Sequence, residues 1–282
     1  MARQNRYLLS AYQELEPLCE KGHVVLVQNT EDGQLYVKKK IISYAPELYW
    51  KLYDDSIDGI PSLYGIYEDP ESNVPVGAAA LILIEEYLPG HTLAQHIRED
   101  GLFSDQKCID IGMQICSILM ELHGRKPAIV HRDIKPSNVM LLPDGSVRLI
   151  DFNAAKVESS METRDTVLIG TAGFAAPEQY GFSASTPQTD LYALGVLMNT
   201  MLTGTLPWER QTNGRLRSII SRCMKNGSET ALCWGMGAKC CIEKSEKATN
   251  PLAASRLSYF ALVQNDPGIS MVCFCFHIRF WR

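Results

Sequence analysis

The order of apolar patterns along the chain limits its possible folds more than any single residue does. Residues 23–28 (HVVLVQ) and 34–42 (QLYVKKKII) read as two β-strands joined by a turn, and further strand-like runs follow a short helix around 46–54. After Tyr87 the apolar residues recur at helical spacing, most clearly in a long segment that Ser104 could cap. Strands followed by helices predict an α+β protein with two lobes.

The composition is that of an ordinary globular protein. The 282 residues are 46% hydrophobic and 21% charged, which is enough for one large domain or two lobes around a cleft. A net charge of −5 gives no reason to expect nucleic acid as a partner. No run of about 18 apolar residues is present, so no membrane-spanning helix is expected. The first residues lack the apolar core of a signal peptide, so we expect the nine cysteines to be thiols in the cytoplasm.

A polar loop at residues 131–138 (HRDIKPSN) carries groups that suit phosphoryl transfer. Asp133 could accept or orient the proton of an attacking hydroxyl, and Lys135 could hold the transferring phosphate. Asn138 and Asp151 offer hard oxygen ligands to Mg²⁺, and the hairpin between them would bring both to one edge of a cleft. A polar turn would explain any one of these residues, but it does not explain the whole set in this order.

Three motifs in this order resemble the protein-kinase signature set: HRDIKPSN, Asp-Phe-Asn at 151–153 and GTAGFAAPE at 170–178. The chain is most similar to the eukaryotic-like (Hanks-type) serine/threonine protein kinases of bacteria, over roughly residues 15–225. The resemblance implies a bilobal fold with a β-rich N-lobe at 1–87 and a mainly helical, incomplete C-lobe at 88–225. It also implies ATP with Mg²⁺ (Mn²⁺ is the alternative) as cofactors and a protein as the substrate.

The resemblance assigns a role to each polar residue of the loop and its surroundings. Asp133 matches the catalytic aspartate, while Asn138 and Asp151 match the two metal ligands. Lys135 matches the lysine that is typical of serine/threonine rather than tyrosine kinases. Thr171 lies where such kinases place a hydroxyl that hydrogen-bonds the catalytic aspartate.

Two further residues support this loop according to the resemblance. Asp190 matches an aspartate that braces the loop backbone from a buried helix. Arg132 matches an arginine that can pair with a phosphate on the activation loop. The candidate acceptors of that phosphate are Ser159, Ser160, Thr163 and Thr166. An activation loop that becomes ordered without a phosphate is the alternative.

The lysine that would hold the ATP phosphates is chosen by strand alternation. Val37 and Lys39 share one face of their strand, while Lys38 and Lys40 share the other. Val37 would then take the small apolar position over the adenine, whereas Lys38 as the ATP lysine would put the bulky Tyr36 there. We expect Lys39 to be the ATP lysine, with Lys38 as the alternative and Lys40 as a solvated charge.

The remaining nucleotide-binding residues are assigned more loosely. Glu47 is the only glutamate of the helix that follows and is expected to pair with Lys39; a carboxylate favoured by the helix dipole is the alternative. In EEYLPG the backbone groups of Glu86 and Leu88 would face the adenine. Glu85 then occupies the gatekeeper position, where a buried carboxylate needs a partner such as Lys39 or a proton. An alignment error of one residue is the alternative.

Two departures affect the phosphate-binding and metal-binding segments. Gly22 and Val24 align with the last Gly-x-Val of a glycine-rich loop, but Pro17 and Cys19 stand where two glycines should be. Their presence predicts weaker or differently shaped ATP binding. Asn153 replaces the glycine of Asp-Phe-Gly, and asparagine is among the non-glycine residues that best tolerate a left-handed backbone. We therefore expect the metal-binding Asp151 to remain usable and the loop to flip less easily.

The C-terminal end departs further from the resemblance. Glu178 should pair with an arginine shortly after residue 225, yet no arginine occurs until Arg256. We therefore expect residues 226–282 to be a divergent, foreign or frameshifted tail. Its cysteines are Cys233, Cys240, Cys241, Cys273 and Cys275. A zinc site is the alternative, although paired Cys-x-x-Cys spacing is absent. An arginine-bearing segment in another reading frame of the coding DNA would support the frameshift.

Three functions fit these residues to different degrees. The complete set of Asp133, Asn138 and Asp151 predicts ATP-dependent phosphorylation of serine or threonine hydroxyls on proteins, including autophosphorylation of the activation loop. The altered glycine loop and the incomplete C-lobe favour instead a pseudokinase that serves as a nucleotide- or protein-binding scaffold. A small-molecule phosphotransferase shares a similar loop but lacks a segment like 171–178.

Overall fold

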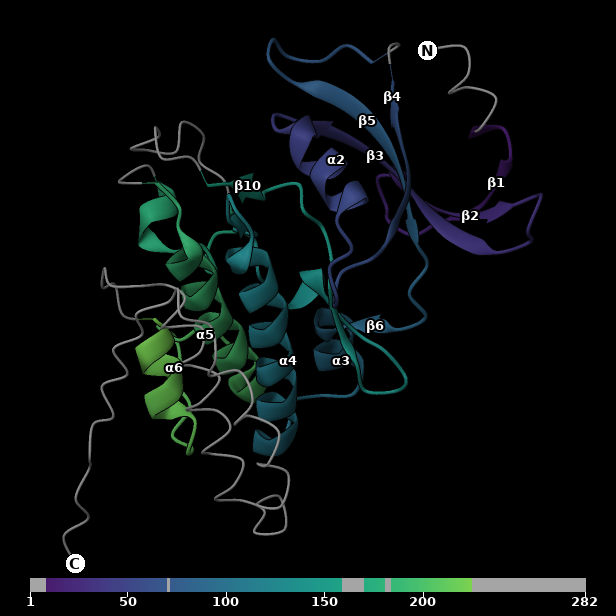
Figure 1. Cartoon of the computed structure of the whole chain (residues 1–282). Coiled ribbons are helices and arrows are strands. Elements are labelled where there is room, and N and C mark those ends of the chain that lie inside the picture. The colour runs from purple at the N-terminus through teal and green to yellow at the C-terminus, as the bar shows by residue number, and fades with distance from the viewer. Residues whose placement is uncertain (1–8, 70–71, 159–169, 181–183, 225–282) are drawn as a thin grey trace, which may run out of the picture.

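Five antiparallel strands form one sheet in the first part of the chain (Figure 1). In the computed structural model, which describes residues 9–69, 72–158, 170–180 and 184–224, the strand order is β1-β2-β3-β5-β4. The strands are β1 (Tyr12–Pro17), β2 (Val24–Asn29), β3 (Leu35–Ser43), β4 (Leu63–Glu68) and β5 (Ala79–Glu86). β3 lies between β2 and β5, so it is a central strand of the sheet.

A short helix, α2 (Pro46–Asp54), follows β3 and packs against the sheet. A proline at its first position suits the helix start, because its missing N–H would have no partner there. Leu48 and Leu52 are four residues apart and so share one side of the helix. Both are buried in the same hydrophobic core as Ile41 of β3 and Leu83 of β5. This packing defines the face of β3 and β5 that borders the core.

The rest of the described chain is mainly helical. Its helices are α3 (Leu93–Glu99), α4 (Asp105–Gly124), α5 (Pro187–Thr203) and α6 (Arg217–Cys223), with short 3₁₀ turns at Pro136–Asn138 (η1) and Pro177–Tyr180 (η2). Short strands pair β6 (His91–Thr92) with β8 (Val139–Leu141), β8 with β9 (Val147–Leu149), and β7 (Ile129–Val130) with β10 (Lys156–Val157). The Ser104 side chain accepts a hydrogen bond from the Lys107 N–H, which confirms the expected cap of α4.

The arrangement confirms the expected α+β fold, with a sheet in the first part and helices in the second. Residue boundaries of the lobes at 87 and 225 stay predictions. The expected tail at 226–282, its cysteines and the four candidate phosphate acceptors lie outside the described residues. Within the part of the chain that the structure describes, no helix is both long and apolar enough to cross a membrane.

Candidate active site

A buried aspartate holds the backbone of the loop between β7 and η1. Asp190 of α5 is fully buried and accepts hydrogen bonds from the N–H groups of His131 (2.8 Å) and Arg132 (2.7 Å). His123 Nε2 lies 2.8 Å from the same carboxylate. Burial alone would raise the pKa of Asp190, but the hydrogen bond and the charge of His123 lower it below the ordinary value. The predicted brace is therefore confirmed.

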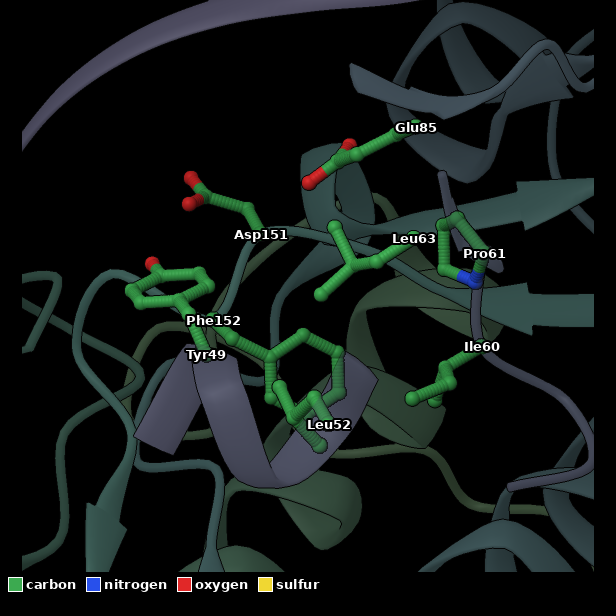
Figure 2. A pocket seen from close by; sticks show the side chains of 8 residues that line it. All are labelled: Tyr49, Leu52, Ile60, Pro61, Leu63, Glu85, Asp151 and Phe152. Atoms are coloured by element: carbon green, nitrogen blue, oxygen red, sulfur yellow. The ribbon is translucent and has the colours of Figure 1, made fainter. Parts of the chain in front are cut away.

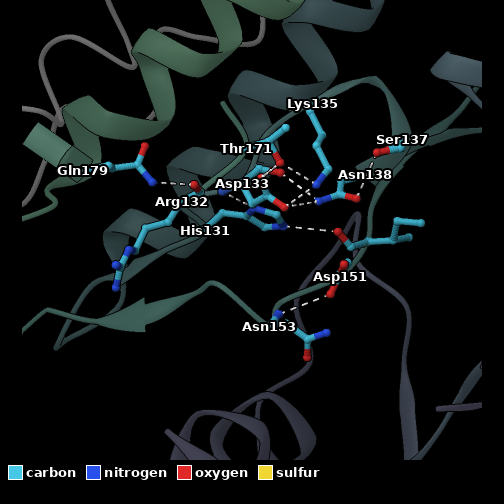
Figure 3. Close-up of polar contacts among 11 residues, drawn as sticks. His131, Arg132, Asp133, Lys135, Ser137, Asn138, Asp151, Asn153, Thr171 and Gln179 are labelled. Carbon is cyan, nitrogen blue, oxygen red and sulfur yellow. Dashed lines mark hydrogen bonds and ion pairs between the residues drawn. The ribbon is translucent and has the colours of Figure 1, made fainter. Parts of the chain in front are cut away.

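Asp133 lies at the centre of a polar cluster (Figure 3). Its Oδ1 accepts a hydrogen bond from Thr171 Oγ1 (2.7 Å), which is the contact expected from the sequence. Its Oδ2 accepts hydrogen bonds from Lys135 Nζ (2.7 Å) and Asn138 Nδ2 (3.0 Å). Lys135 Nζ also donates to Thr171 Oγ1 (2.7 Å), which links the activation segment to the loop. Both carboxylate oxygens of Asp133 are thus fixed in direction.

The hairpin of β8 and β9 brings Asp151 beside Asn138. Val139 pairs with Leu149 across the hairpin, and the Ile150 N–H donates to the Asn138 carbonyl (2.9 Å). Asp151 follows β9 by two residues and has a left-handed backbone (φ 67°). The two residues expected to hold a metal therefore project from adjacent points of one loop and one strand end (Figure 3).

The donor atoms at this point suit Mg²⁺. The amide nitrogen of Asn138 donates to the Asp133 carbonyl (2.9 Å) and carboxylate (3.0 Å), so a cation would bind the amide oxygen, which accepts a long hydrogen bond from Ser137 Oγ (3.5 Å). Asp151 adds a carboxylate. Mg²⁺ is commonly bound by one or two such protein oxygens together with substrate phosphates. Asn138 and Asp151 are the residues that would hold it.

The left-handed backbone of the segment 151–153 does not fall on Asn153. The left-handed residue is Asp151, two positions earlier, and the Asn153 N–H donates to Asp151 Oδ1 (3.3 Å). Aspartate tolerates this conformation almost as well as asparagine does, so the turn does not require it at Asn153. The Asn153 side chain instead accepts a hydrogen bond from the Tyr49 hydroxyl of α2 (2.7 Å).

Lys39 lies on the core-facing side of β3, beside Glu85 of β5. Lys39 Nζ is 2.6 Å from Glu85 Oε2, and both side chains are largely buried. Burial alone would lower the pKa of Lys39, but the Glu85 carboxylate and the charge of Asp151 raise it above the ordinary value. Lys38 points the other way and pairs with Glu14 (3.0 Å), while Lys40 is exposed. The strand alternation expected from the sequence is present.

The expected pair between Lys39 and Glu47 does not form. Glu47 is exposed in the first turn of α2, the place that the helix dipole favours for a carboxylate. Two α2 residues, Tyr49 and Leu52, line the pocket of the site, and Tyr49 is the polar one. Burial, followed by the charges of Asp151 and Glu85, raises the pKa of Tyr49, so its hydroxyl stays protonated and serves as a hydrogen-bond donor. Tyr49 was not predicted as a site residue from the sequence, where its position between the apolar Leu48 and Trp50 gave no sign of a polar role.

A small pocket lies between the sheet, α2 and the segment after β9 (Figure 2). Glu85 and Asp151 place their carboxylates at one side of it, and Tyr49 contributes its ring. The remaining lining side chains are Leu52, Ile60, Pro61, Leu63 and Phe152. The pocket therefore combines an apolar wall with the two acidic groups whose charges raise the pKa of Lys39.

The turn between β1 and β2 is tight. Pro17 pairs with Val25, and the Leu18 N–H donates to the Val24 carbonyl (2.8 Å). Gly22 has a left-handed backbone (φ 66°) and donates to the Cys19 carbonyl (3.0 Å). These hydrogen bonds engage the N–H groups of Leu18 and Gly22 within the turn, so these two groups are not available to a nucleotide phosphate.

The other expected nucleotide contacts lie along β2, β3 and the end of β5. Val24 pairs with Lys39, and Val37 pairs with Glu85, so these four side chains share one face of the sheet. The Glu86 N–H donates to the Ser62 carbonyl (2.9 Å). Because that N–H is engaged, an adenine would meet the Glu86 carbonyl rather than its N–H. Leu88 follows β5 and is buried.

Gln179, which was not predicted from the sequence, connects η2 to the loop at 131–138 by hydrogen bonds. Its Nε2 donates to the Arg132 carbonyl (2.7 Å), and its Oε1 accepts from the Ala176 N–H (2.9 Å). Its position directly after the Ala-Pro-Glu motif is the sequence feature that could have indicated this role. Glu178, for which an arginine partner was expected, accepts a hydrogen bond from Thr189 Oγ1 (2.8 Å) of α5.

We expect Tyr49→Phe to lower the free energy of unfolding by roughly 1 kcal/mol, because it removes the hydrogen bond to Asn153 without leaving a cavity. Chemical denaturation of the variant measures the change. Tyr53→Phe is the matched control, since Tyr53 is an exposed residue of the same helix. Equal destabilisation by both variants would contradict this role of Tyr49.

A sheet followed by helices, with a braced Asp-Lys-Asn loop and a second aspartate after a hairpin, defines the architecture of protein-kinase-like proteins. A family model described as the protein kinase domain matches residues 20–250. Since the match covers most of the chain, the chain belongs to the protein kinase domain family. The match also extends beyond residue 225, where the resemblance was expected to end.

Curated relatives of the chain are bacterial serine/threonine-protein kinases. A Corynebacterium efficiens kinase is 33% identical over 50% of this chain and 27% of its own length. The kinase PknB of Mycobacterium leprae is 32% identical over 52% of this chain and 24% of its own. A probable kinase of Clostridium acetobutylicum is 37% identical over 46% and 20%, respectively. The matched part of this chain thus spans about a quarter of the length of these relatives.

Proposed function

We propose that the chain transfers the γ-phosphate of ATP to serine or threonine hydroxyls of protein substrates, including those of its own activation segment. The observation that carries this proposal is the geometry of Asp133. Both of its carboxylate oxygens are held by Thr171, Lys135 and Asn138 next to Asp151. A scaffold that only bound proteins would need no such arrangement. The names of the relatives support the same activity.

In the proposed reaction, the substrate hydroxyl oxygen forms a bond to the γ-phosphorus of ATP while the bond to the β-phosphate oxygen breaks, giving ADP. Asp133 orients the hydroxyl and accepts its proton. Lys135 lies 2.7 Å from Asp133 and supplies positive charge where negative charge develops on the phosphoryl group. Asn138 and Asp151 would hold Mg²⁺, which would neutralise negative charge at the phosphates.

The proposed nucleotide site uses the sheet and the segment after it. Lys39 holds the α- and β-phosphates with its ammonium group, whose pKa is raised. Val24 and Val37 cover the adenine from the sheet, and Gly22 borders the phosphates. The Glu86 carbonyl and the Leu88 backbone bind the adenine edge.

One observation favours a second candidate function, a pseudokinase that binds nucleotide or protein without turnover. The turn between β1 and β2 is closed by its own hydrogen bonds at Leu18 and Gly22. Such a turn offers fewer backbone N–H groups to phosphates than an open glycine-rich loop does. This candidate predicts ATP binding without phosphate transfer.

Labelled ATP, Mg²⁺ and a generic protein substrate test the proposal. We expect Mg²⁺-dependent labelling, and we expect Asp151→Asn to reduce its rate by about 10²–10³-fold, because the variant removes a negative charge that binds the cation. Asp144→Asn is the matched control, since Asp144 is exposed at the turn of the same hairpin. Wild-type protein that gives no label, or label that is independent of Mg²⁺, would overturn the proposal.

A further inference from the structure

We propose that Glu85 is the residue that positions Lys39 for ATP, so that the sheet, and not helix α2, sets the place of the ATP lysine. This inference rests on the proposed function and extends it to the regulation of the same site. Glu85 of β5 thus takes the role of pairing with Lys39 that was expected for Glu47 of α2.

The strand register alone brings the two side chains together. Val37 of β3 pairs with Glu85, and Lys39, two residues on, pairs with Leu83. Lys39 and Glu85 are therefore diagonal neighbours on one face of the sheet, a spacing that long side chains can bridge. Lys39 Nζ reaches Glu85 Oε2 at 2.6 Å. Because both backbones belong to the same hydrogen-bonded ladder, the pair moves with the sheet.

Burial makes this pair a strong constraint on Lys39. The side chains of Lys39 and Glu85 are 15% and 12% exposed, and the apolar Leu63 lies in the same pocket as Glu85. A carboxylate in such surroundings is costly unless it is paired, and the same holds for the ammonium. The pair therefore fixes Lys39 and keeps it charged, the state in which it can hold phosphates.

Helix α2 has different contacts. Glu47 is exposed, and the helix contacts the site through the Tyr49 hydroxyl, which donates to Asn153 Oδ1 (2.7 Å). The backbone N–H of Asn153 in turn donates a hydrogen bond to the Asp151 carboxylate. A displacement of α2 would thus disturb the segment of Asp151 but would leave the Lys39–Glu85 pair intact. Regulation through α2 would act on the cation-binding aspartate and not on the ATP lysine.

The pH dependence of Lys39 acylation, read by peptide mass spectrometry, tests the pairing without any turnover. We expect Glu85→Gln to move the midpoint of Lys39 acylation to lower pH, because the Glu85 carboxylate then no longer opposes the effect of burial and the charge of Asp151 is the cause that still raises the pKa of Lys39. Glu47→Gln tests the competing partner and should leave the midpoint unchanged. Glu68→Gln, at the exposed end of β4, is the matched control. A midpoint that moves with Glu47→Gln and not with Glu85→Gln would overturn the inference.

Binding of a fluorescent ATP analogue tests the role of the pair. Glu85→Gln should weaken binding roughly 10- to 100-fold, as expected for the loss of a charged hydrogen bond, while Glu47→Gln stays within about twofold of wild type. Glu85→Leu, which suits the apolar pocket, repeats both measurements if Glu85→Gln does not fold. Unchanged binding in the Glu85 variants would overturn the inference. If Glu85→Gln shifts the acylation midpoint but the wild-type protein does not bind ATP, the proposed function is contradicted while the Lys39–Glu85 pair is supported.

Discussion

Asp133→Asn should reduce the rate of phosphate transfer by about 10²–10⁴-fold, the usual contribution of a positioned general base. The variant keeps the shape of the side chain and the neighbouring Thr171, but it loses the group that accepts the hydroxyl proton. The KM for ATP should stay within about twofold of wild type, because the nucleotide is assigned to Lys39 and the sheet. Steady-state kinetics with a protein substrate measure both quantities.

Asp58→Asn is the matched control for this variant, since Asp58 is an exposed aspartate outside the site. If Asp133→Asn transfers phosphate as fast as the control, Asp133 does not accept the hydroxyl proton in the reaction. A large rise in the KM for ATP with an unchanged kcat would instead place Asp133 in nucleotide binding.

Asp190→Ala should lower the free energy of unfolding by about 3–5 kcal/mol, which is the typical loss when one partner of a buried charged network is removed. Asp190 accepts hydrogen bonds from two loop N–H groups and lies 2.8 Å from His123, so the variant leaves three buried polar groups without this acceptor. Because whole domains are stable by only ~5–15 kcal/mol, the effect should be visible in thermal and chemical denaturation. Glu209→Ala is the control, since Glu209 is exposed.

Asp190→Ala should also change how the free energy of unfolding depends on pH. The pKa of Asp190 in the folded protein is lowered, so its contribution is present above the unfolded pKa of about 4 and is lost as the pH falls through the folded value. The wild-type protein should therefore lose stability more steeply on acidification than Asp190→Ala does. Equal acid slopes for the two proteins would mean that Asp190 is not held ionised by its partners.

The cluster of polar residues in the loop at 131–138 could be predicted because residues that are close in the sequence of one short loop are also close in space. Asp133, Lys135 and Asn138 lie within one turn-rich segment, and hydrogen bonds within that segment link their three side chains. The brace by Asp190 could be predicted only through the resemblance, because 57 residues separate it from Asp133. Strand alternation sufficed to separate Lys39 from Lys38, since the period of a strand is fixed.

The partner of Lys39 was predicted less directly, because Glu47 was expected and Glu85 was named only as a buried carboxylate that needs a partner such as Lys39 or a proton. The choice of Glu47 assumed that a helix glutamate would turn toward the sheet, but α2 has nine residues and directs Leu48, Tyr49 and Leu52 inward. Helix orientation depends on packing against the rest of the chain, which local sequence does not encode. The register between β3 and β5, which places Glu85 beside Lys39, is likewise a long-range property.

The central claim is that the chain is a working serine/threonine kinase and not a scaffold. Phosphoamino-acid analysis of a protein substrate after incubation with wild-type chain, Mg²⁺ and labelled ATP tests it most directly, with Asp133→Asn assayed in parallel. We predict label on serine or threonine with the wild-type chain and at least a hundredfold less with the variant. Equal label with both proteins, or no label while ATP still binds, would contradict the claim.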